Sequence, residues 1–244
     1  MISKPRTRAL WTLDAVGFTL VELLTVIAII GILATILIPT LGSARTSANK
    51  ARTRSQFSQW AAAFEGFRQE YGSYPQLYPQ GTQHVVNQNA STNALQEHLF
   101  HDTLTGHRRD PSGTWPAATT RNPPMPQAQN TRRTQFVSFT DSDFVTSADV
   151  TAGYNTNAQL NFIRDGFHNT SIAVITDANL DGVINARDAT GGYPAVTVSG
   201  GTLTIRPLTT DLPTTQTGGV HAGVIFYSAP PGASVGTDLI MSWK

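Results

Sequence analysis

A stretch in the last third of the chain carries oxygen-bearing side chains at regular spacing. In "DANLDGVINARD", residues 177–188, Gly182 stands at position six, where a sharp turn is needed, and Val183 at position seven would offer its carbonyl oxygen. Calcium takes about six to eight oxygen ligands in flexible geometry. The spacing therefore predicts a calcium site in this loop. The side-chain donors stand at positions one, three, five, nine and twelve: Asp177, Asn179, Asp181, Asn185 and Asp188.

The stretch resembles the calcium loop of EF-hands, with Asp188 in place of the usual final glutamate, and the loops of dockerins, which also end in aspartate. Residues 171–176 read as a strand, and the "ATGGYP" that follows the loop is unsuited to a helix. We therefore expect an isolated loop, with Ile184 anchoring it in apolar surroundings. The alternative is a turn, rich in Asx residues and glycine, that binds no ion.

A second chemical feature is a lone carboxylate, Glu22, inside a long apolar run. Residues 18–41 hold no other ionisable side chain. As a helix they would be about 36 Å long, enough to cross a hydrocarbon layer of about 30 Å. A charge at the centre of such a span costs about 2.5–3.5 kcal/mol, and less near an end. Glu22 should therefore have a cationic partner, yet the run contains no Lys or Arg.

Cleavage between Gly17 and Phe18 would create that partner, because the new amine on Phe18 would lie about one helical turn from Glu22. In a stack of staggered helices, the amine of a neighbouring copy could pair with Glu22 instead. Glu22 would then set the register of assembly, a known role of isolated buried polar groups. One alternative is an ordinary secretory signal peptide cut near residues 42–44, although the apolar run is longer than usual for that class. Another is a plain, uncleaved anchor.

The stretch "GFTLVELLTVIAIIGILATILIP", residues 17–39, resembles the start of type IV prepilins and type II secretion pseudopilins. In that family a prepilin peptidase cuts after the glycine and methylates the new N-terminus. The resemblance implies cleavage after Gly17, methylation of Phe18 and a register role for Glu22. It is close from residue 17 to about residue 75.

Gly31 and Pro39 match the positions at which the family weakens its helix. Glycine costs a helix interior about 1 kcal/mol and proline about 3 kcal/mol. Pro39 has no N–H to donate to the carbonyl of Thr35, four residues earlier. The resemblance favours a segment that stretches or melts when a subunit leaves the bilayer; the alternative is a kinked membrane helix with no further role.

The resemblance also implies partners and a location. We expect a leader over residues 1–17, which is cytoplasmic before cleavage, one crossing of the inner membrane and a periplasmic domain. The implied partners are the prepilin peptidase, other pilin or pseudopilin subunits, the inner-membrane assembly platform and the lipid of the inner membrane. Nucleic acid is not expected as a partner, because the net charge is +1 and 14% of residues are charged. Arginines flank a proline-rich loop at residues 108–133; we read it as a solvated loop, the alternative being contact with an anionic surface or with DNA.

These features require an α+β fold with a long N-terminal helix packed on a C-terminal antiparallel sheet, as in pilins. We expect four parts: the leader (1–17), a transmembrane half-helix (18–41), an amphipathic half-helix (42–71) and a globular domain (72–244). In the amphipathic half, apolar residues recur mostly at steps of three and four until Gly72 and Pro75 end the helix. A short helix is expected at 93–104, and "SGGT" at 199–202 indicates a hairpin. Expected strands are 135–139, 159–164, 171–176, 195–199, 202–206, 220–227 and 238–243.

The closing segment, residues 224–244, also resembles the last hairpin of pseudopilins. Many major pseudopilins bind calcium near that hairpin, but here the segment offers only Asp238, so the usual family site is doubtful.

The sequence argues against catalysis. It has no cysteine, hence no disulfide, thiolate metal site or cysteine nucleophile. Serine-hydrolase, zinc-protease, phosphate-loop and dinucleotide motifs are missing, so we do not expect an enzyme. We expect a structural subunit of a type II secretion pseudopilus. The alternatives are a type IV pilus subunit for adhesion, motility or DNA uptake, and a membrane-anchored, calcium-dependent binding module that does not polymerise.

Overall fold

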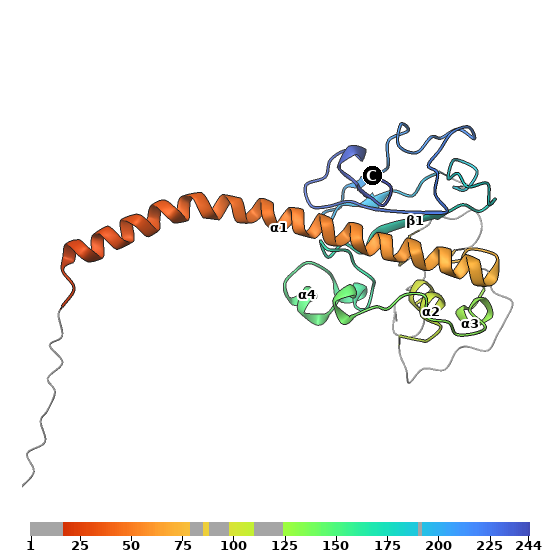
Figure 1. Ribbon diagram of the computed structural model, residues 1–244, viewed down its shortest axis with the longest axis horizontal. Coiled ribbons are helices and arrows are strands. Elements are labelled where there is room, and N and C mark those ends of the chain that lie inside the picture. The colour runs from red at the N-terminus through yellow and green to blue at the C-terminus, as the bar shows by residue number, and fades with distance from the viewer. Residues whose placement is uncertain (1–16, 79–84, 88–97, 110–123, 190–191) are drawn as a thin grey trace, which may run out of the picture. The chain divides into compact units, whose positions relative to one another are not determined.

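The computed structural model describes residues 17–78, 85–87, 98–109, 124–189 and 192–244 (Figure 1). The chain divides into two compact units, Met1–Thr46 and Ser47–Lys244, and the helix α1, Leu20–Tyr71, contributes to both. The expected leader, residues 1–17, lies outside the described residues except for Gly17. The expected proline-rich loop falls largely outside them too, because residues 110–123 are not described.

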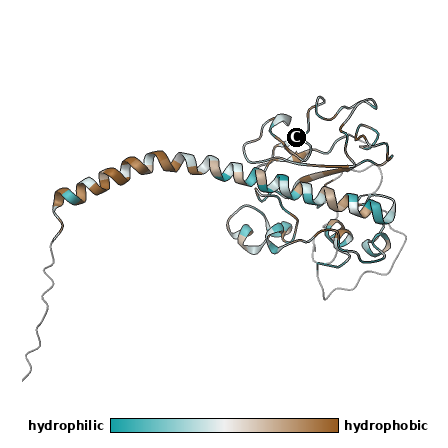
Figure 2. Ribbon diagram, in the orientation of Figure 1, coloured by the Kyte–Doolittle hydropathy of each residue, from teal (hydrophilic) through white to brown (hydrophobic). Residues whose placement is uncertain are grey.

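In the first unit, α1 is apolar around its whole circumference. Apart from the partly buried Ala34, the described side chains between Leu20 and Leu41 are exposed, and the hydrophobic colouring of Figure 2 is concentrated in this part of the helix. Among the described residues, α1 is the one helix long and apolar enough to span a membrane. This confirms the expected N-terminal membrane-competent helix.

In the second unit, α1 is amphipathic. Phe57, Trp60, Phe64 and Phe67 are buried at steps of three and four residues, whereas Gln59 between them is exposed. The helix ends at Gly72, whose φ of 78° is left-handed and whose N–H donates to the carbonyl of Arg68 at 2.7 Å. The predicted end of the helix is therefore confirmed.

The second unit contains a three-stranded antiparallel sheet in the order β1-β4-β5. Its strands are β1 (Ile172–Thr176), β4 (Val224–Ser228) and β5 (Ile240–Met241). In the pairing of β1 with β4, Ile172 lies opposite Ser228 and Thr176 opposite Val224. The strands consist mainly of β-branched and aromatic residues, which favour a buried pleated surface.

Both faces of this sheet are covered, so β1 and β4 are buried at every position. On one face Val174 and Phe226 join the core formed with Phe57, Trp60 and Phe64 of α1. On the other face Ile175 and Tyr227 join a second core with residues of the loop-rich C-terminal layer. At Gly166 the chain passes so close to α1 that a Cβ would lie 2.7 Å from the carbonyl oxygen of Asn49. The α+β architecture thus packs one helix against one face of a small sheet.

The predicted hairpin is present as β2 (Val196–Thr197) and β3 (Thr204–Ile205), which pair antiparallel around Gly200 with φ of 73°. The remaining helical elements are short. They are α2 (Leu99–Thr105), α3 (Pro126–Gln129), α4 (Ser147–Thr151), η1 (Asp141–Asp143), η2 (Asn157–Gln159) and η3 (Gly236–Asp238). The expected helix at 93–104 corresponds to α2, and residues 93–97 of that range lie outside the described residues.

Two predicted strands, 135–139 and 159–164, are wrong. Residues 135–139 are extended but belong to no strand. Phe136 packs on Phe67 of α1, with ring centroids 5.4 Å apart, so this apolar side chain contacts a helix rather than a neighbouring strand. In 159–164 the side chain of Gln159 accepts the N–H of Thr156 and closes the turn of η2. The N–H of Ile163 donates to Oδ1 of Asn87, and its backbone pairing is limited to one isolated antiparallel bridge with Phe144.

Candidate functional site

The Gly17–Phe18 bond precedes the first turn of α1 and is exposed. The side chain of Phe18 is 80% exposed, and no heavy atom lies within 4 Å of the position that a Cβ on Gly17 would take. Because this bond lies in non-helical backbone, a peptidase could reach it without unwinding the helix. The geometry is therefore compatible with cleavage at the predicted position.

Glu22 has a local partner that the sequence interpretation missed. Its Oε2 accepts the backbone N–H of Thr19 at 2.9 Å and the hydroxyl of Thr19 at 2.8 Å, and its own N–H lies 3.2 Å from the hydroxyl oxygen of Thr19. This reciprocal arrangement is a capping box, which satisfies free donors at the start of a helix. The sequence signal was present in "TLVE", residues 19–22, where threonine and glutamate stand three apart. A carboxylate at this place also faces the positive end of the helix dipole.

The hydroxyl groups in the apolar part of α1 are satisfied within the helix. Thr35, for example, donates to the carbonyl of Ile32 at 2.7 Å. Such bonds remove the need for a polar partner outside the helix in an apolar medium. The same pattern, with acceptors three or four residues earlier, holds for Thr25, Thr40, Ser43 and Thr46.

Gly31 and Pro39 both lie inside α1, which continues past each of them. No heavy atom lies within 4 Å of a Cβ built on Gly31, so this glycine is not required by close packing within the described residues. Its role as a weak point of the helix, and that of Pro39, stay predictions.

The loop at residues 177–188 is ordered by its own acidic side chains. Asp177 is fully buried; its Oδ1 accepts the N–H of Asp181 at 3.2 Å and its Oδ2 that of Gly182 at 2.7 Å. At the other end Asp188, 5% exposed, accepts the N–H groups of Ala178 and Asn185, both at 2.9 Å. Asp188 thus joins the two ends of the loop through Ala178, whereas Asp177 holds the turn in its middle.

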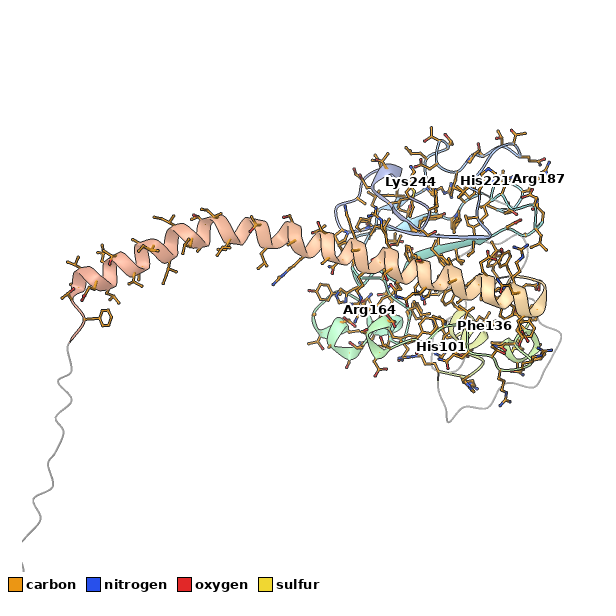
Figure 3. All side chains as sticks on the ribbon, viewed as in Figure 1. His101, Phe136, Arg164, Arg187, His221 and Lys244 are labelled. Atoms are coloured by element: carbon orange, nitrogen blue, oxygen red, sulfur yellow. The ribbon has the colours of Figure 1, made fainter. Side chains whose placement is uncertain are left out.

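The middle of the loop turns sharply, as its spacing predicts. Gly182 has a φ of 83° and Leu180 a φ of 60°, both in the left-handed region. Asp181 accepts the N–H of Val183 at 2.9 Å. Ile184 is fully buried and exchanges two backbone hydrogen bonds with Val220, at 2.8 and 3.0 Å, which anchors the far side of the loop. Arg187, which follows at the periphery in Figure 3, bonds Gln216 rather than a carboxylate of the loop.

The donor set has the chemistry that calcium requires, but its carboxylates do not converge. Among the described residues, no group of three or more His, Asp or Glu side chains is arranged to hold a metal ion. The loop carboxylates face backbone amides instead, and each oxygen retains a further lone pair. Within the described part of the chain, no Lys or Arg forms an ion pair with Asp177, Asp181 or Asp188. Burial, with a smaller contribution from the charge of Asp177, raises the pKa of Asp188.

Asp238 in the closing hairpin serves a structural purpose. Its Oδ2 accepts the N–H groups of Ser234 at 2.8 Å and Val235 at 3.1 Å, which closes the turn of η3. These hydrogen bonds lower the pKa of Asp238. In the described structure it stabilises the turn between β4 and β5.

The arginines near the proline-rich loop are distributed among local contacts. Arg109 lies over the ring of Phe144, 3.2 Å from its centroid, and donates its backbone N–H to Asp102 at 3.0 Å. Arg132 forms an ion pair with Glu70 of α1. Arg121 lies outside the described residues. Arg109 and Arg132 therefore each have a partner within the folded unit.

The described functional features are an exposed Gly17–Phe18 bond, a capped and exposed apolar helix, and a separate loop closed by its own aspartates. The first two share the N-terminal unit, whereas the loop belongs to the second unit. Comparison of the chain with protein-family models, curated proteins and solved structures finds no match.

Proposed function

We propose that this protein is a prepilin-like structural subunit of a type II secretion pseudopilus, cut after Gly17 by a prepilin peptidase and methylated on Phe18. The observation that carries the proposal is the position of Glu22. It stands in the first turn of α1, four residues after Phe18, in a helix whose next twenty residues carry no charge and are mostly apolar. The remaining partners would be other pilin or pseudopilin subunits and the inner-membrane assembly platform.

The exposed half of α1 supports assembly because it needs an apolar environment. Leaving apolar side chains in water costs about 25 cal/mol per Å². Before assembly the inner membrane would supply that environment, with the domain that follows in the periplasm. After assembly the same half-helices from several subunits would form a shared core. The amphipathic half already has its partner in the sheet.

The hydrogen bonds of Glu22 leave room for an intersubunit contact. Both bonds from Thr19 end on Oε2, while Oε1 receives no donor from the described residues. The amine of Phe18 on a neighbouring subunit could bind Oε1 without displacing the cap. Glu22 would then cap the first turn of its own α1 and also set the position of the neighbouring subunit's helix.

A type IV pilus subunit is the second candidate, because the helix argument applies to both assemblies. A deletion strain separates them. Loss of exported proteins from the medium, with surface filaments retained, would support the pseudopilus. Loss of surface filaments with normal export would support the pilus. If both persist and the purified protein stays monomeric, the third candidate, a non-polymerising binding module, is favoured.

We also propose that residues 177–188 bind one calcium ion. The ligands would be the side chains of Asp177, Asn179, Asp181, Asn185 and Asp188 with the carbonyl of Val183. Support comes from the spacing of the donors, the turn at Gly182 and the two buried aspartates that lack an ion pair within the described residues. Calcium would neutralise these carboxylates and further stabilise a loop that its own aspartates already hold, in a chain that has no disulfide.

A further inference from the structure

A pocket of about 380 Å³ opens on the second unit, away from the features described above. Three segments line it: residues 153–159 after α4, residues 168–171 before β1, and residues 197–201 at the β2–β3 turn. Its volume falls in the lower part of the range for small-molecule sites. From this pocket we infer a binding site for a neutral sugar unit of a glycan.

The pocket is polar without being charged. Among the described residues that line it there is no Asp, Glu, Lys or Arg, while amide and hydroxyl side chains are abundant. Burial and the nearby charge of Arg164 lower the pKa of His168, which favours its neutral ring, although the carboxylate of Asp149, 2.8 Å from Nδ1, opposes this shift. Amides and hydroxyls both donate and accept hydrogen bonds, as sugar hydroxyls do. The lining therefore favours a neutral, hydroxyl-rich ligand over an anion or a cation.

An aromatic platform stands at this pocket. The ring of Tyr154 is 56% exposed and stacks on His168, with centroids 4.3 Å apart and planes 13° apart. His168 covers one face of the tyrosine, which leaves the other for a ligand. The electron-rich face of an aromatic ring attracts positively polarised hydrogens, such as the C–H groups on one side of a pyranose.

The pocket is held in shape before any ligand arrives. Gln159 donates to the hydroxyl of Thr170 at 2.8 Å, and Asn169 donates to the carbonyls of Thr197 and Ala229, both at 2.9 Å. The backbone N–H of Tyr154 donates to the carbonyl of Asp149 at 3.0 Å, which fixes the platform to α4. A rigid site loses less conformational entropy on binding.

One acceptor in the pocket lining lacks a donor. Asn155 is 9% exposed, and its Oδ1 receives no hydrogen bond from the described residues, although its Nδ2 donates to the carbonyl of His168 at 3.0 Å. Buried acceptors are usually satisfied. Because this oxygen is itself buried, a sugar hydroxyl beside Tyr154 could donate to it only if Asn155 or its neighbours move.

Binding can be tested on an array of neutral, sialylated and sulfated glycans with the full-length protein in lauryldimethylamine oxide, a detergent without a sugar headgroup. The wild type should bind neutral glycans. Tyr154→Ala should weaken binding about tenfold, whereas Tyr154→Phe, which keeps the ring, should stay within about threefold. Leu208→Ala removes another exposed apolar side chain and should change nothing.

Absence of neutral-glycan binding by the wild type, or equal binding by Tyr154→Ala, would overturn the inference, as would stronger binding of the acidic glycans. NMR of the best-bound glycan with the wild type gives a second readout that needs no variant. Protons on one face of the sugar should shift upfield under the ring of Tyr154, and no such shift would contradict stacking. The site does not depend on the proposed function, because binding is measured on unassembled protein.

Discussion

Oε2 of Glu22 accepts both the backbone N–H and the hydroxyl of Thr19, at 2.9 and 2.8 Å, at the first turn of α1. A carboxylate at the edge of an apolar span therefore has a local function in addition to the intersubunit function we propose for it. The two functions make different demands on its chemistry. Capping needs an acceptor oxygen, which an amide also offers, whereas pairing with an amine needs the negative charge.

Glu22→Gln and Thr19→Val separate these functions. Glu22→Gln keeps an acceptor for the cap and removes the charge, so we expect a stable subunit that assembles poorly. Thr19→Val removes the hydroxyl from the cap, at a cost of about 0.5–2 kcal/mol at the helix start, but retains the charge, so assembly should stay near wild type. Crosslinking of sheared filaments measures both. Wild-type assembly of Glu22→Gln would refute the register role, and loss of assembly in Thr19→Val alone would assign the effect to the cap.

The calcium loop can be tested by thermal melting of a fragment that begins at Arg45, with calcium and with chelator. A ligand at a hundredfold excess over its Kd adds about 2.7 kcal/mol of stability. We expect calcium to raise the melting temperature of the wild type, and magnesium to do so poorly because it requires tighter octahedral geometry. Asp181→Asn should weaken the response, since it removes one negative charge from the loop while its amide still offers an oxygen ligand.

Asp238→Asn is the matched control, because it alters a loop carboxylate in the closing hairpin, the place that the resemblance to pseudopilins suggests for calcium. It should leave the calcium response intact. An equal response in the wild type and Asp181→Asn, combined with its loss in Asp238→Asn, would move the site to the closing hairpin. If calcium does not change the melting temperature of the wild type, residues 177–188 form a turn that binds no ion.

Asp165 gives the folded protein a pH-dependent stability. It is 4% exposed, and burial raises its pKa from 3.8 to about 6, although Ser228, Phe167 and Asn169 donate hydrogen bonds to its carboxylate. Between about pH 4 and 6 the folded state holds this proton more tightly than the unfolded state. The contribution of Asp165 to stability therefore falls as pH rises through that window and is constant above it.

Asp165→Asn should remove this pH dependence. At pH 8 its free energy of unfolding should exceed that of the wild type by up to about 3 kcal/mol, which corresponds to a shift of about two pKa units. Urea unfolding at pH 4, 6 and 8 measures the difference. Asp141→Asn, at an exposed aspartate, should leave the pH profile unchanged. A wild-type profile in Asp165→Asn would show that Asp165 does not carry the effect.

Trp60 stabilises the junction between α1 and the sheet. Its ring meets those of Phe100 and Phe226 edge-on, with centroids 5.1 and 5.5 Å apart, and its side chain is 2% exposed. Trp60→Ala should cost about 3–5 kcal/mol in the free energy of unfolding. The neighbouring exposed Gln59→Ala should cost less than about 0.5 kcal/mol. Urea denaturation measures both values. A similar decrease in the free energy of unfolding in the two variants would contradict a stabilising role for the packing of Trp60 between α1 and the sheet.

Local patterns in the sequence predicted the elements that depend on them. The spacing of Phe57, Trp60 and Phe64 gave the buried face of α1, and the run around Val174 gave β1. The Thr19–Glu22 cap is also encoded locally, because threonine and glutamate stand three residues apart at the start of the helix.

Other features depend on residues far apart in the chain and could not be predicted. Phe136 alternates as a strand residue does, yet its partner is Phe67 of a helix. The N–H of Ile163 is satisfied by the side chain of Asn87 rather than by a strand. The pocket beside Tyr154 combines three separate segments, none of which carries a motif. In each case tertiary packing decided the structure, and no short sequence window contains that information.

Processing after Gly17 is tested by the N-terminal mass of the mature protein, isolated from cells that contain a prepilin peptidase. We predict a chain that begins at Phe18 and carries one additional methyl group. Gly17→Asp should remain uncut, and because the surroundings of Gly17 are open, this change should not disturb the fold. A wild-type chain that begins at Met1, or one that begins after Ala44, would contradict processing after Gly17.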